Sequence, residues 1–219
     1  MKLKQTSQYG AILNRVGIAL ILAGVLDIAY MVYCVNYSPT LHIPGVVAGV
    51  FLLRGNLHTV SIVTWYAAYI SSNFISHILI LLPFSKPAEL WVTEFHLDPV
   101  GLFVPYLVSI GAIALFVWIY TQLRAAPVVS ARVRSGDSAS IPKSAFILGI
   151  GLVILMVGIR HFIINGADGA KAVEIARAQY GQNYKYHIKG ISWSNQNVSA
   201  QLTAYNEQEI KPIQVEWKQ

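Results

Sequence analysis

Long apolar runs alternate along the chain with short polar connections. Four of these runs have about 20 residues or more, namely Val16–Val35, Val60–Pro83, Val100–Leu123 and Ser144–Ile164. A helix rises 1.5 Å per residue, so about 20 residues cross the roughly 30 Å apolar core of a bilayer. The pattern therefore predicts four transmembrane helices.

A shorter apolar run, residues 42–53, precedes Arg54-Gly55-Asn56-Leu57-His58. A continuous helix over 43–83 would be roughly 60 Å long, about twice the thickness of the core. Gly55 and Asn56 suit a turn, so we predict a break between two helical segments here, with Arg54 at the headgroup level. The short run itself fits either a crossing, with Arg54–His58 as a cytoplasmic turn, or an interfacial half-helix.

The last part of the chain changes character. Apolar residues recur at helical spacing over about 167–180, and three alternating stretches follow, separated by turns at 194–197 and 206–208. We therefore expect two domains, a helical bundle over 1–166 and a small soluble domain over 167–219 with one helix and about three strands. The fold class is a membrane α-helical bundle of four long transmembrane helices plus a short fifth apolar segment, with a small α+β C-terminal domain.

Composition agrees with insertion into a lipid bilayer. Of the 219 residues, 55% are hydrophobic and 12% charged, whereas soluble domains carry about 25% charged residues. The net charge is +6, but the positive residues flank apolar runs, which indicates membrane orientation, and we expect no nucleic-acid partner. The first run is too long for a signal peptide and is expected to stay. The layout resembles that of many proteins of the bacterial inner membrane.

Basic residues gather in two segments that both favour the cytoplasm. One precedes the first long run and the other precedes the fourth; they contain Lys2, Lys4 and Arg15, and Arg124, Arg132, Arg134 and Lys143. Four crossings would put these segments on opposite faces, whereas a crossing by residues 42–53 puts both on one face. We expect a multi-pass protein of the cell membrane with a cytoplasmic N-terminus. The C-terminal domain is outside with five crossings, which we favour, and inside with the half-helix.

Ionisable residues inside the apolar runs are candidates for function, because a charge in the bilayer costs several kcal/mol unless it is paired. Asp27 lies near the middle of the first run, and Arg160 and His161 lie toward the end of the fourth. We predict that Asp27 has a polar partner on another span, with Arg160 as the first candidate.

The second long run carries a polar stripe. Tyr66, Tyr69, Asn73 and His77 recur at steps of three and four residues and therefore share one helix face. We expect this face to point into the bundle, either as hydrogen bonds between helices or as the wall of a wet cavity. The candidate intramembrane polar cluster is Asp27, Asn73, His77, Arg160 and His161.

Motifs of catalysis are missing from the sequence. It contains no phosphate-binding glycine loop, no H-E-x-x-H and a single cysteine, Cys34. The stretch Glu94-Phe95-His96-Leu97-Asp98 is expected to be a solvated turn. We therefore assign no catalytic, cofactor-binding or metal-binding residue, and we expect no enzyme and no cofactor.

Two functions remain open. The first is a non-catalytic anchor, scaffold or accessory subunit, whose C-terminal domain contacts a partner protein through a sheet edge; a second copy of the chain is another candidate partner. The alternative is a small transporter or channel that uses Asp27, His77 and Arg160. Against the alternative, the sequence contains no inverted repeat.

Overall fold

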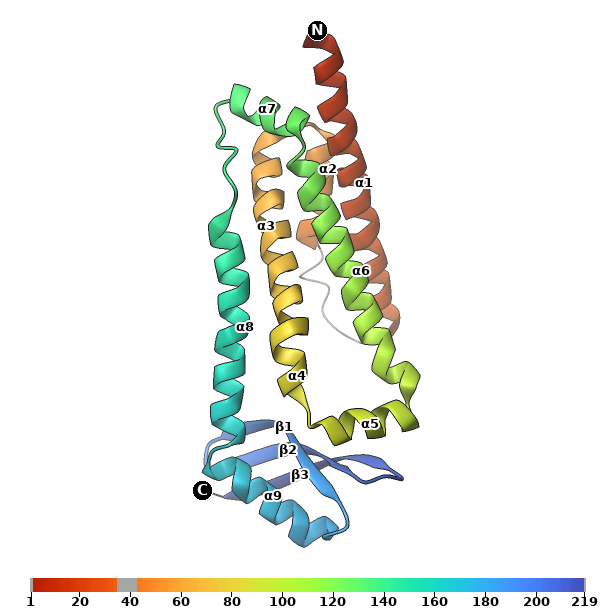
Figure 1. Cartoon of the computed structure of the whole chain (residues 1–219), viewed down its shortest axis with the longest axis vertical. Helices are drawn as coiled ribbons and strands as arrows, with labels where there is room; N and C mark the ends of the chain where they lie inside the picture. Colours follow the sequence, from red (N-terminus) through yellow and green to blue (C-terminus); the bar gives the residue numbers. More distant parts are fainter. Residues whose placement is uncertain (1, 35–42, 219) are drawn as a thin grey trace. The chain divides into compact units, whose positions relative to one another are not determined.

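This computed structural model describes residues 2–34 and 43–218. Within these residues, four helices are long and apolar enough to cross a membrane, as predicted. They lie in α1 (Lys2–Cys34), in the continuous helical stretch Leu57–Ser85, in α6 (Pro99–Leu123) and in α8 (Lys143–Ile164) (Figure 1). Val35, the expected end of the first span, lies outside the described residues.

The predicted break after the short apolar run is confirmed. Helix α2 (Ile43–Leu53) ends before Arg54, and α3 (Leu57–Ser76) begins three residues later. Gly55 has a φ of +74°, a left-handed conformation that glycine adopts without steric cost. The Asn56 side chain then accepts a hydrogen bond from the Thr59 N–H at 3.2 Å and caps the new helix. Gly55 and Asn56 therefore determine this turn locally.

The second long span contains a π-helical segment. After α3, η2 (His77–Leu81) leads into α4 (Leu82–Ser85), and the Leu82 N–H donates to the His77 carbonyl five residues back. Pro83 has no N–H for the usual helical bond, and such local adjustments satisfy backbone groups near a proline. The span therefore remains helical through Pro83.

Two helices lie where we expected only polar connections. Helix α5 (Ala88–Leu97) includes the stretch expected to be a solvated turn, and α7 (Ala126–Arg134) lies in the basic segment before α8. Both begin next to a proline, Pro87 or Pro127, a residue whose fixed φ suits a first helical turn. The expectation of a turn at Glu94–Asp98 was wrong because the short amphipathic pattern of α5 was overlooked.

The C-terminal element order is as predicted. Helix α9 (Ala167–Tyr180) precedes the antiparallel strands β1 (Lys185–Ser194), β2 (Asn197–Tyr205) and β3 (Ile210–Lys218), arranged in the order β1-β2-β3. Alternate strand residues face α9 and form a core with it, which contains Ala172, Ala176, Ile188, Ala200, Leu202 and Val215. One face of the sheet is thereby covered by α9 (Figure 1).

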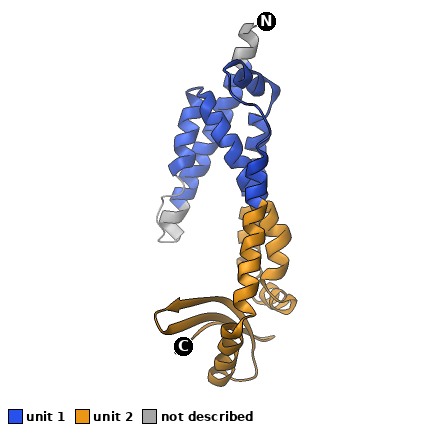
Figure 2. Cartoon of the chain, turned by 90° about the vertical axis from the view of Figure 1, so that its left-hand side faces the viewer, with its two compact units in different colours: residues 1–72, 112–149 blue, residues 73–111, 150–219 orange. Residues whose placement is uncertain are grey.

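The chain divides into two compact units (Figure 2). Unit 1 comprises residues 1–72 and 112–149, and unit 2 comprises residues 73–111 and 150–219. The boundary crosses α3, α6 and α8, whereas the domain boundary expected at 166/167 coincides with the start of α9. That expected boundary stays a prediction.

Candidate functional site

Unit 1 gathers the ends of several helices around one core. The core joins the early part of α1, the end of α2, the start of α3, the end of α6 and α7 through Leu13, Val16, Leu52, Val60, Ile119, Leu123 and Val128. These elements flank the basic residues Arg15, Arg54, Arg124 and Arg134. The turn after α2 thus shares one end of unit 1 with the two basic segments.

Arg132 is built into this end of the unit. Its side chain is only 3% exposed, and its Nη2 donates to the Ser61 hydroxyl of α3 at 2.9 Å and to the Ser138 carbonyl. Arg124 donates to the carbonyls of Ala139 and Ser140 in the same connection. The segment before α8 is therefore held by one buried and one half-buried arginine, so Arg132 has a structural role that the sequence did not indicate.

Unit 2 contains a polar junction between helix ends and the sheet. The Arg160 guanidinium of α8 donates from Nη2 to the Ser85 carbonyl of α4 at 2.9 Å, and the same atom lies 3.5 Å from His187 Nε2 on β1. Arg160 and His187 are both half-buried. One cation of α8 thus contacts two other elements, α4 and β1, that are far from it in the sequence.

The junction favours the neutral form of His187. Burial lowers the pKa of His187 below its usual value, and the nearby Arg160 lowers it further, while contact with the Ser85 backbone opposes these effects. Lys86 and Lys189 add smaller effects in the same direction as Arg160. A neutral ring can accept a hydrogen bond from the guanidinium, which is the contact that the geometry provides.

Two ion pairs surround the junction. Lys185 of β1 pairs with Glu89 of α5 at 2.5 Å, and Lys86 pairs with Glu94 of α5 at 2.6 Å. The Lys86 ammonium also lies 5.0 Å from the centre of the Trp91 ring. Helix α5 thereby connects the end of α4 to β1.

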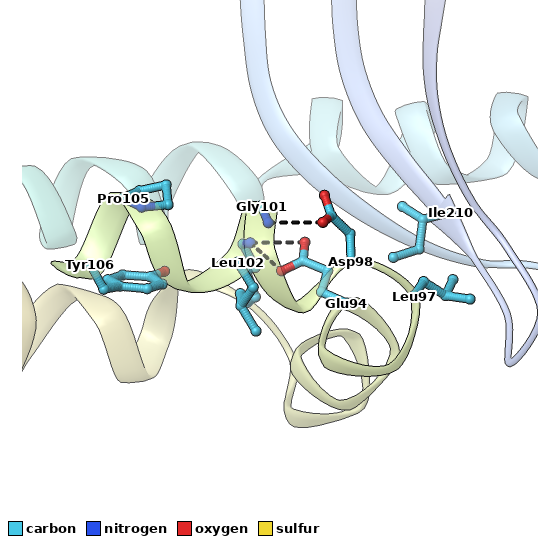
Figure 3. Close-up of a pocket in the computed structure, with 9 residues that line it drawn as sticks. Glu94, Leu97, Asp98, Gly101, Leu102, Pro105, Tyr106 and Ile210 are labelled. Atoms are coloured by element: carbon cyan, nitrogen blue, oxygen red, sulfur yellow. Dashed lines mark hydrogen bonds and ion pairs between the residues drawn. The ribbon is translucent and has the colours of Figure 1, made fainter. Parts of the chain in front are cut away.

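A cavity of about 470 Å³ lies beside α5, and Figure 3 shows its lining. Glu94 accepts hydrogen bonds from Lys86, and Asp98 accepts one from the Gly101 N–H at 2.8 Å, which caps the start of α6. Tyr106 and Ile210 complete the wall. The Lys86–Glu94 pair thus ties the end of α4 to α5, and the Asp98 bond fixes the start of α6.

The structure places the predicted polar cluster in two units. Asp27 belongs to unit 1, whereas Asn73, His77, Arg160 and His161 belong to unit 2. Asp27 and His77 occupy exposed positions, and the His161 ring contacts the Asn165 amide at 3.0 Å. The predicted pairing of Asp27 with Arg160 stays a prediction.

The polar stripe of the second span is partly exposed, although Tyr66 packs edge-on against Phe116 of α6, and its expected inward orientation stays a prediction. Tyr66 is 47% exposed and His77 is exposed. Buried positions of α3 instead carry mostly small or β-branched side chains, namely Val60, Val63, Thr64, Ala67, Ala68, Ser71, Ser72 and Ser76. Small residues let helices approach closely.

His187 and Arg132 were the main residues that sequence reasoning missed. His187 lies in an alternating strand and Arg132 in a basic connection, so local pattern marked neither. His187 pairs with Thr203 and lies on the sheet face away from the α9 core. Because side chains alternate between the two faces of a strand, the sequence could have indicated that His187 does not face α9. No pattern in the sequence around Arg132 indicates that its side chain is buried.

The described residues contain no group of three or more His, Cys, Asp or Glu side chains that could hold a metal ion. Comparison of the chain with protein-family models, with curated proteins and with solved structures found no match.

Proposed function

We propose that this chain is a non-catalytic multi-pass membrane protein that holds its α9–sheet domain outside the cytoplasm, where the domain contacts a partner protein. The observation that carries this proposal is the polar junction of unit 2. Arg160, His187, Lys185 and Glu89 engage one another or backbone groups across α8, α4, α5 and β1. Such paired groups hold the sheet on the helix ends.

The shared basic end of unit 1 supports the orientation. Basic residues favour the cytoplasmic side, and the α2–α3 turn, the early part of α1 and the segment after α6 meet around one core. Helix α8 begins at that end, where Ser144 accepts a hydrogen bond from Trp65 at 3.1 Å. With 22 residues, α8 is about 33 Å long, enough to carry the chain across the bilayer. The domain after α8 then lies outside.

This orientation favours the five-crossing topology over the interfacial half-helix. Glycines bring α2 against α1, because a Cβ on Gly49 would lie 2.7 Å from the Gly17 carbonyl oxygen. Helix α2 has only 11 residues, about 16 Å, so the bilayer must be thinned or the neighbouring helices must shield its ends. Arg54 then lies on the cytoplasmic side with the other basic residues.

The β1 edge is the surface that we assign to the partner. The β3 edge carries Pro212, which has no N–H, together with Lys211 and Lys218, and such residues protect an edge from pairing. The first half of β1 is occupied by the junction and ends in a bulge before Gly190. Residues 191–194 follow the bulge without lysine or proline and can accept an extended segment of another protein.

A photoreactive amino acid at Ser192 tests this assignment in intact cells, with the same amino acid at Gln214 of β3 as the control. Both positions are exposed sheet residues. We expect one discrete adduct at Ser192 whose cross-linked peptide comes from an extended segment of another protein, and none at Gln214. An adduct of twice the chain's mass would identify a second copy and contradict an accessory role, as would equal adducts at both positions or none at either.

The alternative of a transporter or channel receives no specific support. It needs Asp27, His77 and Arg160 to act together, yet Asp27 and His77 occupy exposed positions and Arg160 is engaged by Ser85 and His187.

A further inference from the structure

A second cavity of about 470 Å³ lies in unit 2, beside the last turns of α8. Arg160, His161 and Asn165 of α8 and the following turn, together with His187 of β1, supply its polar groups. Val157 lies about one helical turn before Arg160, and Asn165 lies about one turn after His161. Polar side chains of the lining thus gather in the last turns of α8 and just after it, beside apolar ones.

The opposite wall of this cavity is apolar. Leu81 of η2 and Phe84 of α4 line it, and Phe84 is 75% exposed. Ile164 adds an apolar side chain from α8. A large exposed aromatic ring beside a cationic group favours an amphiphilic ligand over a small water-soluble anion, because only an amphiphile covers both surfaces.

Arg160 has donors to offer to such a ligand. A guanidinium carries five N–H groups in a planar fork that matches phosphate oxygens. Within residues 2–34 and 43–218, the hydrogen bonds of Arg160 use Nη2, which donates to Ser85. That bond fixes the orientation of the guanidinium, while Nη1 and Nε remain available to a phosphate.

The position of Arg160 along the helix agrees with this chemistry. It lies four residues before α8 ends at Ile164, within a helix long enough to cross a bilayer. The end of a spanning helix lies near the lipid headgroups, where arginine meets phosphate. The charge of Arg160, the apolar lining of the cavity and its position near the headgroups thus all suit an amphiphilic anion.

We propose that this cavity binds one anionic phospholipid, with its phosphate on the Arg160 guanidinium and an acyl chain along Leu81, Phe84 and Val157. The inference rests on the proposed placement in a membrane and is independent of the proposed partner at β1. A lipid bound there would fill the space between α8 and α4 and strengthen the junction with the sheet.

Native mass spectrometry of the purified full-length protein tests the proposal. Phosphatidylglycerol and phosphatidylcholine with identical acyl chains are titrated separately into the detergent-solubilised protein, and the first bound lipid is counted. We expect at least about tenfold tighter first binding of phosphatidylglycerol, because the choline cation of phosphatidylcholine cancels the charge of its phosphate and is repelled by Arg160, whereas phosphatidylglycerol keeps its negative charge. Equal binding of the two lipids would overturn the proposal.

Three variants locate the lipid. Arg160→Gln removes the cation, and Gly158→Leu fills the cavity, since a Cβ at Gly158 meets no atom within 4 Å. Both should lower the phosphatidylglycerol affinity about tenfold. Arg54→Gln removes an exposed arginine of unit 1 and should leave the affinity unchanged.

Two controls address misfolding of a variant and binding of a free anion. If Arg160→Gln fails to fold, Gly158→Leu decides alone, and undiminished lipid binding in that variant would overturn the proposal. Inorganic phosphate at millimolar concentration should displace little of the lipid. Full displacement would show that the site recognises phosphate without the acyl chain, which also contradicts a lipid site.

Discussion

The guanidinium of Arg160 on α8 lies 3.5 Å from the imidazole Nε2 of His187 on β1, and it donates to the Ser85 carbonyl at 2.9 Å. A histidine beside a fixed cation favours its neutral form, because a second positive charge would be repelled. The contact therefore joins the sheet to the helices only while His187 is unprotonated.

This contact predicts that acid weakens the junction. Burial and Arg160 lower the pKa of His187 in the folded protein, whereas the ring in the unfolded chain titrates near its usual value of about 6.5. Above that pH the ring is neutral in both states and the full stability is present. As the pH falls through about 6.5, the unfolded chain binds a proton that the folded chain resists, so stability is lost.

The thermal midpoint in detergent, measured between pH 7.5 and 5.5, checks this prediction. His187→Gln keeps a hydrogen-bond acceptor without the titration, so its midpoint should fall less steeply with acid than that of the unmodified chain. Identical pH dependence of the two proteins would show that the pKa of His187 is the same in the folded and unfolded states.

The second prediction concerns the ion pair between Lys185 and Glu89, whose charged atoms are 2.5 Å apart. Folding raises the pKa of Lys185, first through its hydrogen bond to Glu89. Because the amine and the carboxylate are in contact, a water-soluble carbodiimide should link the two side chains as an amide within one chain in intact membranes, although the raised pKa of Lys185 slows the coupling. Peptide mass spectrometry should find this link, and Glu89→Gln should abolish it. Cross-links that join Lys185 only to other carboxylates would be incompatible with the docked sheet.

The third prediction concerns the close approach of α1 and α2. A methyl group at Gly49 would overlap the Gly17 carbonyl oxygen and the Ile21 side chain, each at 2.7 Å. Gly49→Ala should therefore cost about 1–3 kcal/mol, seen as a lower thermal midpoint. Gly45→Ala on the same helix meets no atom within 4 Å and should cause no loss. Equal midpoints for the two variants would mean that the helices do not meet at Gly49.

The fourth prediction concerns the buried Arg132. Arg132→Ala leaves the Ser138 carbonyl and the Ser61 hydroxyl without their donor, which should cost about 1–3 kcal/mol. Limited proteolysis should then cut the segment between α7 and α8 faster. Val133→Ala, at an exposed position on the same helix, serves as the control and should retain the original cleavage rate. An unchanged cleavage rate in Arg132→Ala would show that Arg132 does not hold this segment in place.

The parts of the fold that follow from local pattern could be predicted. Length and apolar composition identify the membrane-length helices, and alternation identifies the strands of the C-terminal sheet. Gly55 and Asn56 mark the break after α2 because the turn depends on their own backbone and side chain. Each of these features is decided within a few residues of the chain.

The candidate site depends on contacts that no local pattern encodes. His187 meets Arg160 because of how β1 packs on the helix ends, and Arg132 meets Ser61 across 71 residues of sequence. The most buried positions of α3 include small side chains such as Ala67 and Ala68, and the polar stripe does not mark them. Helices α5 and α7 were missed because each is short and carries a mixed composition.

The orientation of the chain is the central claim, because it decides where the α9–sheet domain meets its partner. A phosphatase that is active only outside the cytoplasm and a fluorescent protein that matures only inside are each fused after Gln219. As controls, the same two proteins are fused after Gly136, in the basic segment between α7 and α8. We predict phosphatase activity without fluorescence after Gln219, and fluorescence without phosphatase activity after Gly136. Fluorescence without phosphatase activity after Gln219 would place the domain in the cytoplasm and contradict the five-crossing topology.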